Sequence, residues 1–361
     1  HIHKNNTMKE DNNYGTERRN NYRGNSNGYN NRNGGSYNRN GGGGNYRRGG
    51  GGYNNHRGGG RGYNRGGGRF QSRSYGQITN EPTVEELFQK KGSAGINFDN
   101  YDDIPVNKYG DNIPECADSF DEMNLPEKLK DNIKLCGYDK PTPVQKHCVP
   151  ISVQKRDIMT CAETGSGKTA GFLIPIIDNL LKSRENGGSA QPLQGPKDPS
   201  HDSSNMAQPK ALIMSPTREL TTQIYNEARK FTYKSGLNVV VVYGGKPIQH
   251  QVNHLRRGCD IIVATPGRLS DLMRQGYVTM EKIQFMVLDE ADRMLDMGFE
   301  PQIRDIVEGE KMPPAEFRQT MMFSATFPDD IQKLARQFMQ KNYIFLTVGR
   351  VGSATKNVTQ V

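Results

Sequence analysis

Eight consecutive residues have the composition of a phosphate-binding loop: Ala162-Glu163-Thr164-Gly165-Ser166-Gly167-Lys168-Thr169. An apolar run over 157–161 precedes them and an apolar helical pattern follows. A strand, a glycine-rich loop and a helix in that order direct backbone N–H groups and the positive helix end at one anion. The ammonium of Lys168 would reach the outer phosphates, and the hydroxyl of Thr169 would hold Mg²⁺. The stretch predicts binding of a nucleoside triphosphate, although Ala162 stands where this pattern usually begins with glycine.

Two adjacent acids, Asp289 and Glu290, end an apolar run over 285–288 that predicts a buried strand. At the strand end, Asp289 would belong to the Mg²⁺ shell and Glu290 would orient and deprotonate a water molecule. Neighbouring strand residues point to opposite faces, but the backbone turns where a strand ends, so both acids can serve one site. The alternative is a pair of acids that caps the following helix.

The positive charge of the chain is concentrated at its N-terminal end. The first 75 residues hold 12 Arg and 2 Lys against 3 acidic residues, a net charge of +11, whereas the whole chain carries +9. Residues 1–76 are otherwise rich in Gly, Asn, Tyr and Ser, so they lack the apolar surface that would offset the entropy of ordering. We predict a disordered tail whose Arg-Gly-Gly steps and tyrosines contact RNA and favour weak self-association. A solubilising linker without a specific partner is the alternative.

Residues 120–348 alternate apolar runs with helical patterns. Near-continuous apolar strands separated by crossover helices are typical of parallel strands that are covered on both faces. The predicted fold is therefore α/β, a doubly wound parallel sheet, with one helix over 126–136 and another from Pro143. Strands are expected at 157–161, 211–215, 239–243, 260–264, 284–289, 319–323 and 343–348.

Two stretches depart from this alternation. Residues 77–119 contain a short helical pattern at Val84–Lys90 and a mixed acidic and apolar run at 95–106. They predict a linker with an extended arm that lies on the domain, or a short docking peptide, and regular structure is expected from Phe120 onward. Residues 183–209 are rich in Gly, Ser, Pro, Asn and Asp, so they predict a mobile surface insertion.

The five cysteines are odd in number and form no Cys-x-x-Cys pair, so the sequence predicts neither a disulfide framework nor a zinc site. The chain has no apolar run of about 18 residues, and its N-terminus has no apolar core of a signal peptide. We therefore expect a soluble protein of a reducing compartment that makes no contact with a membrane.

The phosphate loop is followed in order by Pro216-Thr217-Arg218-Glu219-Leu220, Gly244-Gly245, Thr265-Pro266-Gly267-Arg268, Asp289-Glu290-Ala291-Asp292 and Ser324-Ala325-Thr326. These six motifs in order resemble those of the DEAD-box ATP-dependent RNA helicases, over about residues 95–361. The resemblance implies a RecA-like P-loop lobe that binds ATP, Mg²⁺ and RNA. The acidic motif with its continuation to Phe299, the 95–106 arm and the Arg-Gly-Gly tail are similar to the Vasa and Belle-type subgroup.

The resemblance also assigns an adenine-reading motif to residues 120–145. Gln145 would hydrogen-bond the adenine edge and Tyr138 would stack on the ring. Phe120 is the matching upstream aromatic residue. A buried two-point hydrogen bond would discriminate against guanine, because a mismatch leaves polar groups unpaired. Glu163 stands where the family more often has Gln, and we expect altered contacts of the phosphate loop rather than lost binding. The ATP-binding residues of this motif would be Phe120, Tyr138, Lys140 and Gln145.

By the same resemblance, three motifs would line an RNA path. Glycines and helix N-termini present N–H groups to phosphates and Arg pairs with them, so such contacts read the backbone and the 2′-hydroxyl rather than the sequence. Ser324 and Thr326 resemble the element that couples hydrolysis to strand separation through hydrogen bonds to Asp292. The RNA-path residues would be Pro216, Thr217, Arg218, Gly245, Thr265, Pro266, Gly267 and Arg268.

Members of this family have a second lobe, which supplies an arginine finger and half of the RNA surface. Residues Val348–Gly352 resemble the start of the linker between the lobes, which we place at 349–361, and these 361 residues contain no Arg-rich motif of the second lobe. We therefore expect this chain to be the N-terminal part of a helicase that remodels RNA duplexes or ribonucleoproteins. The 361 residues alone should bind ATP weakly, hydrolyse it slowly and unwind little RNA.

Two rival functions are open at this point. One is a non-catalytic RNA-binding or condensate-forming scaffold with a single ATP-binding lobe, and the other is a DNA-directed helicase of the same superfamily. The expected partners are RNA, bound by the lobe and the tail, and proteins of ribonucleoprotein granules, contacted by the tail and the 95–106 arm. The expected location is the cytoplasm, including ribonucleoprotein or germ granules.

Overall fold

The computed structural model describes residues 82–89, 104–187, 206–309 and 311–349. The predicted tail over 1–76 and nearly all of the predicted linker over 349–361 lie outside the described residues. So do most of the predicted 95–106 arm and the middle of the predicted insertion.

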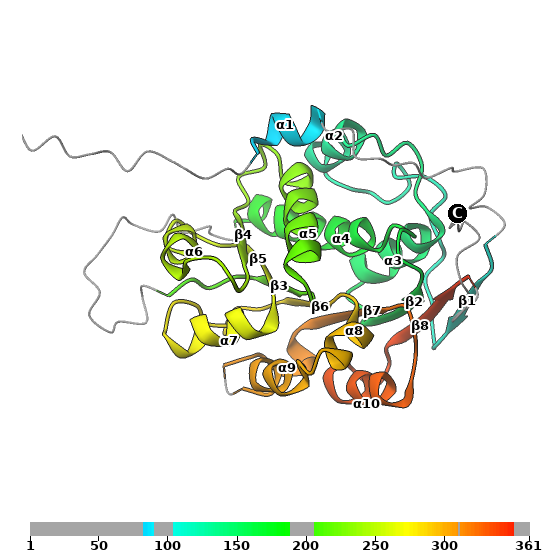
Figure 1. Ribbon diagram of the computed structural model, residues 1–361. Coiled ribbons are helices and arrows are strands. Elements are labelled where there is room, and N and C mark those ends of the chain that lie inside the picture. The colour runs from blue at the N-terminus through cyan, green and yellow to red at the C-terminus, as the bar shows by residue number, and fades with distance from the viewer. Residues whose placement is uncertain (1–81, 90–103, 188–205, 310, 350–361) are drawn as a thin grey trace, which may run out of the picture. The chain divides into compact units, whose positions relative to one another are not determined.

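An eight-stranded sheet organises the described residues, in the order β1-β8-β2-β7-β6-β3-β5-β4 (Figure 1). The strands β2 to β8 are mutually parallel, and β1 pairs antiparallel with β8. The predicted α/β class with a parallel sheet is confirmed. The strands are β1 (Val106–Tyr109), β2 (Ile158–Ala162), β3 (Ala211–Met214), β4 (Val239–Val242), β5 (Ile261–Ala264), β6 (Phe285–Leu288), β7 (Gln319–Ser324) and β8 (Ile344–Val348).

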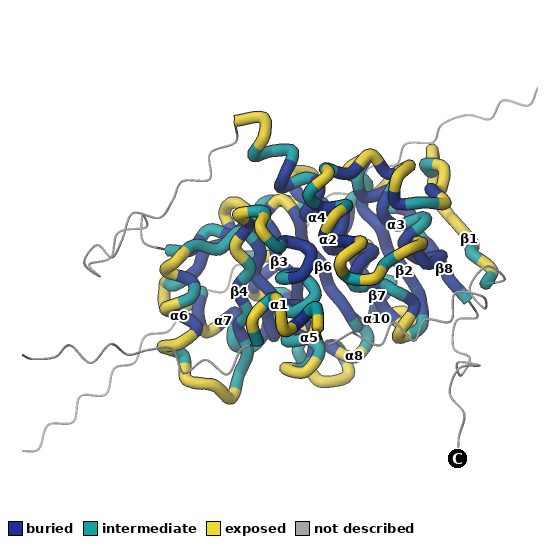
Figure 2. The backbone as a smooth tube through the Cα atoms, turned by 90° about the horizontal axis from the view of Figure 1, so that it is seen from above, coloured by how far each residue is buried: buried dark blue, intermediate teal, exposed yellow. Residues whose placement is uncertain are grey.

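Helices cover both faces of the sheet because successive strand residues point to opposite sides. Ile213 of β3 packs into a core with α2 to α5, and its neighbour Met214 packs into a second core with α6 to α10. Figure 2 shows the strands as the buried centre and the outer turns as exposed. The helices are α1 (Val84–Gln89), α2 (Glu127–Leu135), α3 (Pro143–Val153), α4 (Lys168–Glu185), α5 (Arg218–Phe231), α6 (Ile248–Leu255), α7 (Pro266–Arg274), α8 (Ala291–Asp296), α9 (Glu300–Val307) and α10 (Asp329–Phe338), with a 3-10 turn at Ala315–Phe317.

Two regular elements precede Phe120, the helix α1 and the strand β1, and the sequence predicted only the helix. The helix predicted near Val84 is present as α1, where Leu87 is buried and the Phe88 ring lies edge-on to Tyr233 with the ring centroids 5.5 Å apart. The hydroxyl of Tyr233 donates a hydrogen bond to Glu85 Oε1 (2.9 Å). This helix therefore docks on the end of α5 through apolar and polar contacts together.

The edge strand β1 has no counterpart among the sequence predictions. It pairs with β8 from Val106 opposite Val348 to Tyr109 opposite Phe345, and the Asn107 amide donates to Thr347 Oγ1 (3.3 Å). Only Val106 of the four residues is half-buried, and the other three are exposed. A strand with one face in water and no alternation of apolar residues gives no pattern to detect.

The predicted insertion over 183–209 is shorter at both ends than expected. Helix α4 continues to Glu185, and Ala207 forms a bridge with Val278. Within the ranges that the structure describes, no helix is long and apolar enough to cross a membrane, and the five cysteines are all free.

Candidate nucleotide and nucleic-acid site

The predicted site motifs lie at one edge of the sheet. Because β2 to β8 are parallel, the segments that follow their carboxyl ends meet on the same side, where open α/β sheets bind ligands. The phosphate loop follows β2, the Ser324–Thr326 segment ends β7 and the Asp289–Asp292 acids follow β6. The three RNA-path motifs follow β3, β5 and β4, which occupy the other end of the strand order.

The phosphate loop has the backbone that its glycines predict. Gly165 and Gly167 have φ angles of +85° and +91°, a region that side-chain-bearing residues rarely adopt. The buried Lys168 donates from Nζ to the carbonyl of Ala162 (2.9 Å), so the side chain folds back over the loop. Ala162 itself is the last residue of β2 and pairs with Val348, so this position needs no glycine.

Two side chains at the start of α3 donate hydrogen bonds to the backbone of the phosphate loop. Thr142 Oγ1 donates to the carbonyl of Ser166 (2.8 Å), and Gln145 Nε2 donates to the carbonyl of Gly167 (3.1 Å). Thr142 and Gln145 also form a capping box, in which Gln145 Oε1 accepts from Thr142 N (3.1 Å). Both ends of the buried Gln145 amide are therefore bonded within the protein, and its contact with adenine stays a prediction.

Gly167→Ala should weaken ATP binding far more than Gly165→Ala. A Cβ on Gly167 would lie 2.6 Å from both Gln145 Nε2 and Thr142 Oγ1, whereas a Cβ on Gly165 would meet nothing within 4 Å. Both variants carry the left-handed backbone cost of roughly 1–2 kcal/mol, but only the first also displaces the α3 contacts. We expect about a tenfold loss of ATP affinity beyond that of Gly165→Ala, measured by titration with a fluorescent ATP analogue. Equal losses in the two variants would show that α3 does not shape the loop.

The remaining residues of the adenine-reading motif lie in different surroundings. Phe120 is 7% exposed and belongs to the core under α2 to α5, so little of its ring faces solvent. The half-buried Tyr138 ring packs edge-on against Phe231, with centroids 5.6 Å apart. Lys140 is exposed. Their contacts with a base stay predictions.

The acids after β6 share one site because of an unusual backbone turn. Asp289 is 2% exposed, and the next residue, Glu290, has φ 52° and ψ 52° in the left-handed region. For a residue with a side chain this conformation costs of order 1 kcal/mol or more and marks functional sites. It turns the chain directly into α8, and Glu290 N donates to Asp289 Oδ1 (3.0 Å). In a continued strand, Asp289 and Glu290 would point to opposite faces of the sheet. The turn at Glu290 ends this alternation, so the two carboxylates can serve one site.

The two carboxylates differ in environment. Burial raises the pKa of Asp289 to about 6, against the opposing effect of the nearby Lys168 ammonium. The Glu290 side chain is 18% exposed and Arg293 Nη1 lies 3.5 Å from its Oε2, an atom that accepts no hydrogen bond from the described residues. The ionised form of the buried Asp289 carboxyl group therefore calls for a cation, and the Glu290 carboxylate forms an ion pair with Arg293.

The residues present fit a magnesium-bound triphosphate. The Thr169 hydroxyl and the Asp289 carboxylate are oxygen donors, which Mg²⁺ prefers. In addition, the buried Ser166 Oγ has no hydrogen-bond partner among the described residues, as expected where a phosphate oxygen or water would bind. Thr169 and Asp289 would hold the ion, and the ion would neutralise charge that develops on the phosphates.

A hydrogen-bond network joins the acids after β6 to the segment that ends β7. Asp292 Oδ2 accepts from Thr326 Oγ1 (2.8 Å), Thr326 N (2.9 Å) and Ala325 N (3.2 Å), and Asp292 N donates to Ser324 Oγ (3.4 Å). Burial would raise the pKa of Asp292, but the hydrogen bonds from Thr326 and from Arg293 N together lower it. The hydrogen bonds predicted between these two segments are present, and their role in coupling stays a prediction.

The RNA-path motifs converge around the Gly244–Gly245 turn. Gly245 has φ +80°, and a Cβ there would lie 2.6 Å from Arg218 Nη1. On the other side, Arg268 Nη1 donates to the carbonyl of Lys246 (3.1 Å). Thr217 caps α5 by accepting from Leu220 N (3.3 Å). The structure thus brings the arginines of two motifs to one turn.

The N-terminus of α7 supplies the rest of this group. Thr265 is 8% exposed and precedes the helix, and Pro266 and Gly267 form its first turn. A Cβ on Gly267 would meet nothing within 4 Å, so this backbone is open to a ligand. Pro216 is buried at the end of β3.

Gln251 is a positioning residue that the sequence did not point out. Its buried amide accepts from Tyr243 N (3.1 Å) and donates to the carbonyl of Tyr243 (2.9 Å). This two-point contact fixes the chain one residue before the Gly244–Gly245 turn. The sequence indicates this role only by the polar Gln251 lying next to Val252 and Leu255, the apolar residues of α6 that are buried in the core.

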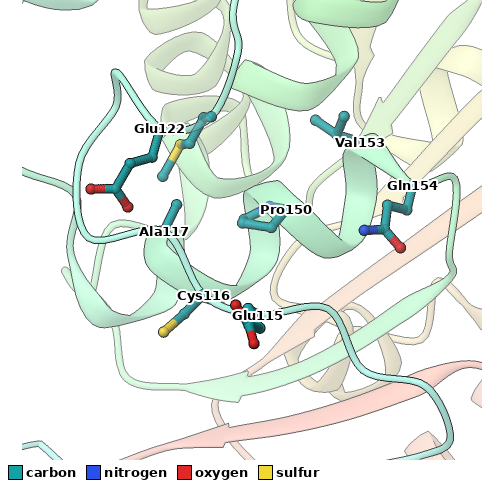
Figure 3. Close-up of a pocket in the computed structure, with 8 residues that line it drawn as sticks. Glu115, Cys116, Ala117, Glu122, Pro150, Val153 and Gln154 are labelled. Carbon is teal, nitrogen blue, oxygen red and sulfur yellow. The ribbon is translucent and has the colours of Figure 1, made fainter.

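A hollow of about 250 Å³ lies at the end of α3 remote from the phosphate loop (Figure 3). It includes none of the predicted site residues. Its lining comes from the segment before α2 and from the last turn of α3, namely Glu115, Cys116, Ala117, Glu122, Met123, Pro150, Val153 and Gln154.

Comparison with known proteins agrees with this geometry. The profile of the DEAD/DEAH box helicase family matches residues 142–334. Among solved structures, the chain is similar to a DEAD box protein from the hyperthermophile Methanococcus jannaschii, with 31% identity over 64% of this chain and 56% of that chain and a TM-score of 0.53.

Two further similar structures are of proteins named Prp28. The RNA helicase Prp28 from Chaetomium thermophilum, bound to ADP, shares 34% identity over 77% of this chain and 59% of its own, with a TM-score of 0.58. The yeast DEAD-box splicing factor Prp28 shares 32% identity over 77% of this chain and 60% of its own, with a TM-score of 0.59. The chain thus spans less than two thirds of the length of each. The family profile covers more than half of this chain, and the chain belongs to the DEAD/DEAH box helicase family.

Proposed function

We propose that the chain is the ATP-binding lobe of an ATP-dependent RNA helicase, which couples ATP binding and hydrolysis to remodelling of RNA duplexes or ribonucleoproteins. The observation that carries this proposal is the hydrogen-bond network of Asp292. It links the acidic segment Asp289–Asp292, which would bind the nucleotide, directly to the segment after β7. A protein that only bound a nucleotide would need no such link. The similarity to an ADP-bound RNA helicase supports the nucleotide assignment.

In this mechanism each part of the site has a separate task. Backbone N–H groups of the phosphate loop and Lys168 bind the triphosphate, and Thr169 and Asp289 hold Mg²⁺. Glu290 accepts a proton from the attacking water with its carboxylate. When ATP is hydrolysed, the hydrogen bonds of Asp292 to Thr326 transmit a shift of the Asp289–Asp292 segment to the end of β7. Arg218 and Arg268 contact the RNA backbone.

RNA should stimulate hydrolysis by this protein, and DNA of the same length and base order should stimulate it less, because contacts with the 2′-hydroxyl favour RNA. The measurement is phosphate release at saturating ATP with each single strand in turn. The basal rate should be low, because the site as described contains no arginine finger against the γ-phosphate. Equal stimulation by DNA would favour a DNA-directed helicase. RNA binding without any hydrolysis would favour the scaffold function.

We also propose that the protein belongs to the Vasa and Belle-type subgroup and acts in the cytoplasm, including ribonucleoprotein or germ granules. The support is the sequence from Asp289 to Phe299, the 95–106 arm and the basic composition of residues 1–76. In this proposal the tail adds RNA contacts and, with the arm, binds granule proteins. Imaging of the tagged chain with and without residues 1–76 tests the location, and an even nuclear distribution would contradict it.

A further inference from the structure

Helix α6 and its flanking residues carry positive charge without acidic compensation. Residues 244–259 contain Lys246, Arg256 and Arg257 together with two histidines, and no acidic residue. Yet the chain beyond the tail is slightly acidic, because the whole chain carries +9 and the first 75 residues carry +11. The charge is thus a local feature of this surface.

The polar side chains form a stripe on the outer face of α6. Val252 and Leu255 are buried in the core, while Lys246, His250 and Arg257 are exposed and His254 is half-buried. Within α6, His250 and His254 are four residues apart and share one face of the helix. Lys246 lies just before the N-cap of this helix and Arg257 just after its C-cap, so the two cations flank the histidines at its two ends. Figure 1 places α6 beside β4, which is the last strand in the order of the described sheet.

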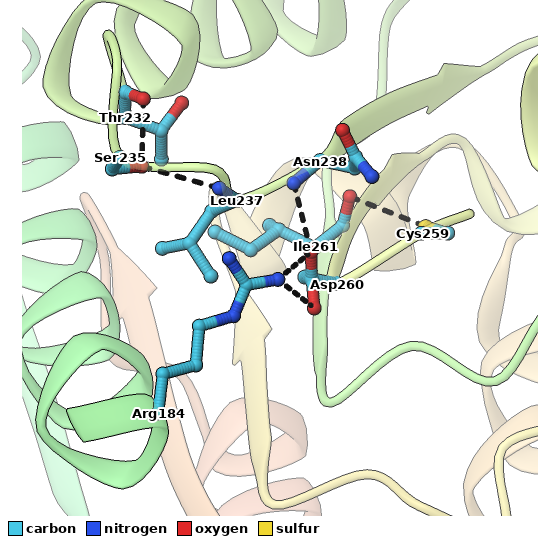
Figure 4. Close-up of polar contacts among 8 residues, drawn as sticks. All are labelled: Arg184, Thr232, Ser235, Leu237, Asn238, Cys259, Asp260 and Ile261. Carbon is cyan, nitrogen blue, oxygen red and sulfur yellow. Dashed lines mark hydrogen bonds and ion pairs between the residues drawn. The ribbon is translucent and has the colours of Figure 1, made fainter. Parts of the chain in front are cut away.

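The acids at the borders of the stripe are already paired. Asp260 accepts from Arg184 Nη2 at both carboxylate oxygens (3.2 and 3.0 Å) and from Asn238 N (2.8 Å), as Figure 4 shows. Asp271 lies 3.9 Å from Arg274. The Asp260 carboxylate is therefore fully bonded, whereas Asp271 forms an exposed ion pair with Arg274.

Helix stability does not account for the stripe. Cations at a helix C-terminus complement its dipole, which suits Arg256 and Arg257, but Lys246 precedes the N-terminus of α6, where a positive charge is unfavourable. The charge at that end of the helix therefore calls for an anionic partner.

The stripe begins at the RNA path. Arg268 donates to the carbonyl of Lys246 itself, and Gln251 of α6 binds both backbone polar groups of Tyr243. The helix, the turn at Gly245 and the N-terminus of α7 are thus joined by hydrogen bonds. Lys246 directly follows Gly245, so the surface begins next to the turn that Arg218 and Arg268 approach.

We infer that the outer face of α6, from Lys246 through His250 and His254 to Arg257, is an additional binding surface for single-stranded RNA. This inference rests on the proposed function and extends its RNA path. Lys246 and Arg257 would pair with phosphates, and the imidazoles would donate hydrogen bonds or stack on bases. The eight residues of α6 span about 12 Å, and a stacked strand rises about 3.4 Å per nucleotide, so the helix offers room for about three or four more nucleotides.

The test compares RNA of two lengths in the full chain, whose tail is the same in every variant. Lys246→Ala/Arg257→Ala should weaken binding of a 12-nucleotide oligouridine about tenfold at 0.1 M salt and lower the salt slope by about 1.4. A six-nucleotide oligouridine is short enough to occupy only the path along Arg218, so the variant should bind it with the affinity of the wild type. The matched control is Lys134→Ala/Arg336→Ala, which removes two exposed charges from α2 and α10 and should leave both oligomers unaffected. Fluorescence anisotropy measures both affinities.

A photocrosslinking experiment separates failure of this inference from failure of the proposed function. A 12-mer that carries 4-thiouridine should crosslink to peptides from both 216–218 and 246–257, identified by mass spectrometry. Crosslinks to 216–218 without any to 246–257, or equal losses in the variant and its control, would overturn the α6 surface alone. Crosslinks to neither would overturn the RNA path itself. If a glutamate-rich peptide displaced the 12-mer from the wild type but not from the variant, the surface would belong to an acidic protein and the RNA assignment would fail.

Discussion

Glu290→Gln should lower the rate of ATP hydrolysis by roughly 10²–10⁴-fold, the range that general-base catalysis supplies, and leave ATP affinity within about twofold. The amide preserves the size of the side chain but cannot accept a proton from water. Glu290 is suited to the base role because it directly follows Asp289 at the end of β6 and its Oε2 accepts no hydrogen bond from the described residues. Steady-state phosphate release and ATP titration measure the two quantities separately.

The matched control is Arg293→Gln, because Arg293 Nη1 lies 3.5 Å from Glu290 Oε2 and forms the ion pair that the first variant also loses. This control keeps the carboxylate, so it should retain most of the turnover. If the two variants lost turnover equally, the ion pair would be the important feature and Glu290 would not be the base. Full turnover in Glu290→Gln would exclude this residue from the chemistry altogether.

Asp289→Asn should stabilise the nucleotide-free protein at neutral pH by about 3 kcal/mol. Burial raises the folded-state pKa of Asp289 to about 6 from 3.8, and each unit corresponds to about 1.4 kcal/mol. A carboxyl group whose pKa is raised by folding contributes most below the unfolded value, and its contribution is lost as the pH rises toward 6. The free energy of unfolding of the wild type should therefore fall between about pH 4 and pH 6, and part of that fall should be absent in the variant.

Denaturant unfolding at a series of pH values measures this effect, and MgATP provides a second readout. Bound Mg²⁺ favours the ionised carboxylate, so MgATP should stabilise the wild type and have much less effect on Asp289→Asn. Asp157 serves as the contrast, since burial also raises its pKa to about 6, but its two oxygens accept from Thr320 N and Gln340 N. Asp157→Asn would turn an amide N–H₂ toward one of these donors and should destabilise the protein. Equal effects of the two variants would contradict a ligand-binding role for Asp289.

The parallel strands could be predicted to within one or two residues because their signal is local. A strand such as β5, buried on both faces, needs apolar residues at nearly every position, and Ile261–Ala264 has them. The phosphate loop and the acids after β6 were equally visible, since glycine spacing and a strand-end acid pair depend on neighbouring residues. The backbone conformation of Glu290 could not be predicted, because glutamate has no preference for a φ angle of 52°.

Contacts between distant segments account for the rest. Gln145 reaches Gly167, and Gln251 reaches back to the end of β4 to hold Tyr243. Both are single polar residues on helices, where the sequence alone cannot tell a surface amide from one that is buried and fully bonded. Strand β1 was missed for the related reason that its partner, β8, lies more than two hundred residues further along the chain.

That pairing of β1 with β8 has a consequence for biosynthesis. Asn107 and Thr347, which bond across the two strands, are separated by 240 residues. At about 5–20 residues per second of translation, the ribosome needs roughly 12–48 s to add the partner after β1 has been made. During that interval β1 is an unpaired strand, and the rest of the sheet can assemble before it. The nascent lobe should therefore close with β1 last, and chaperones that shield free strand edges would act on the segment around Val106 during synthesis.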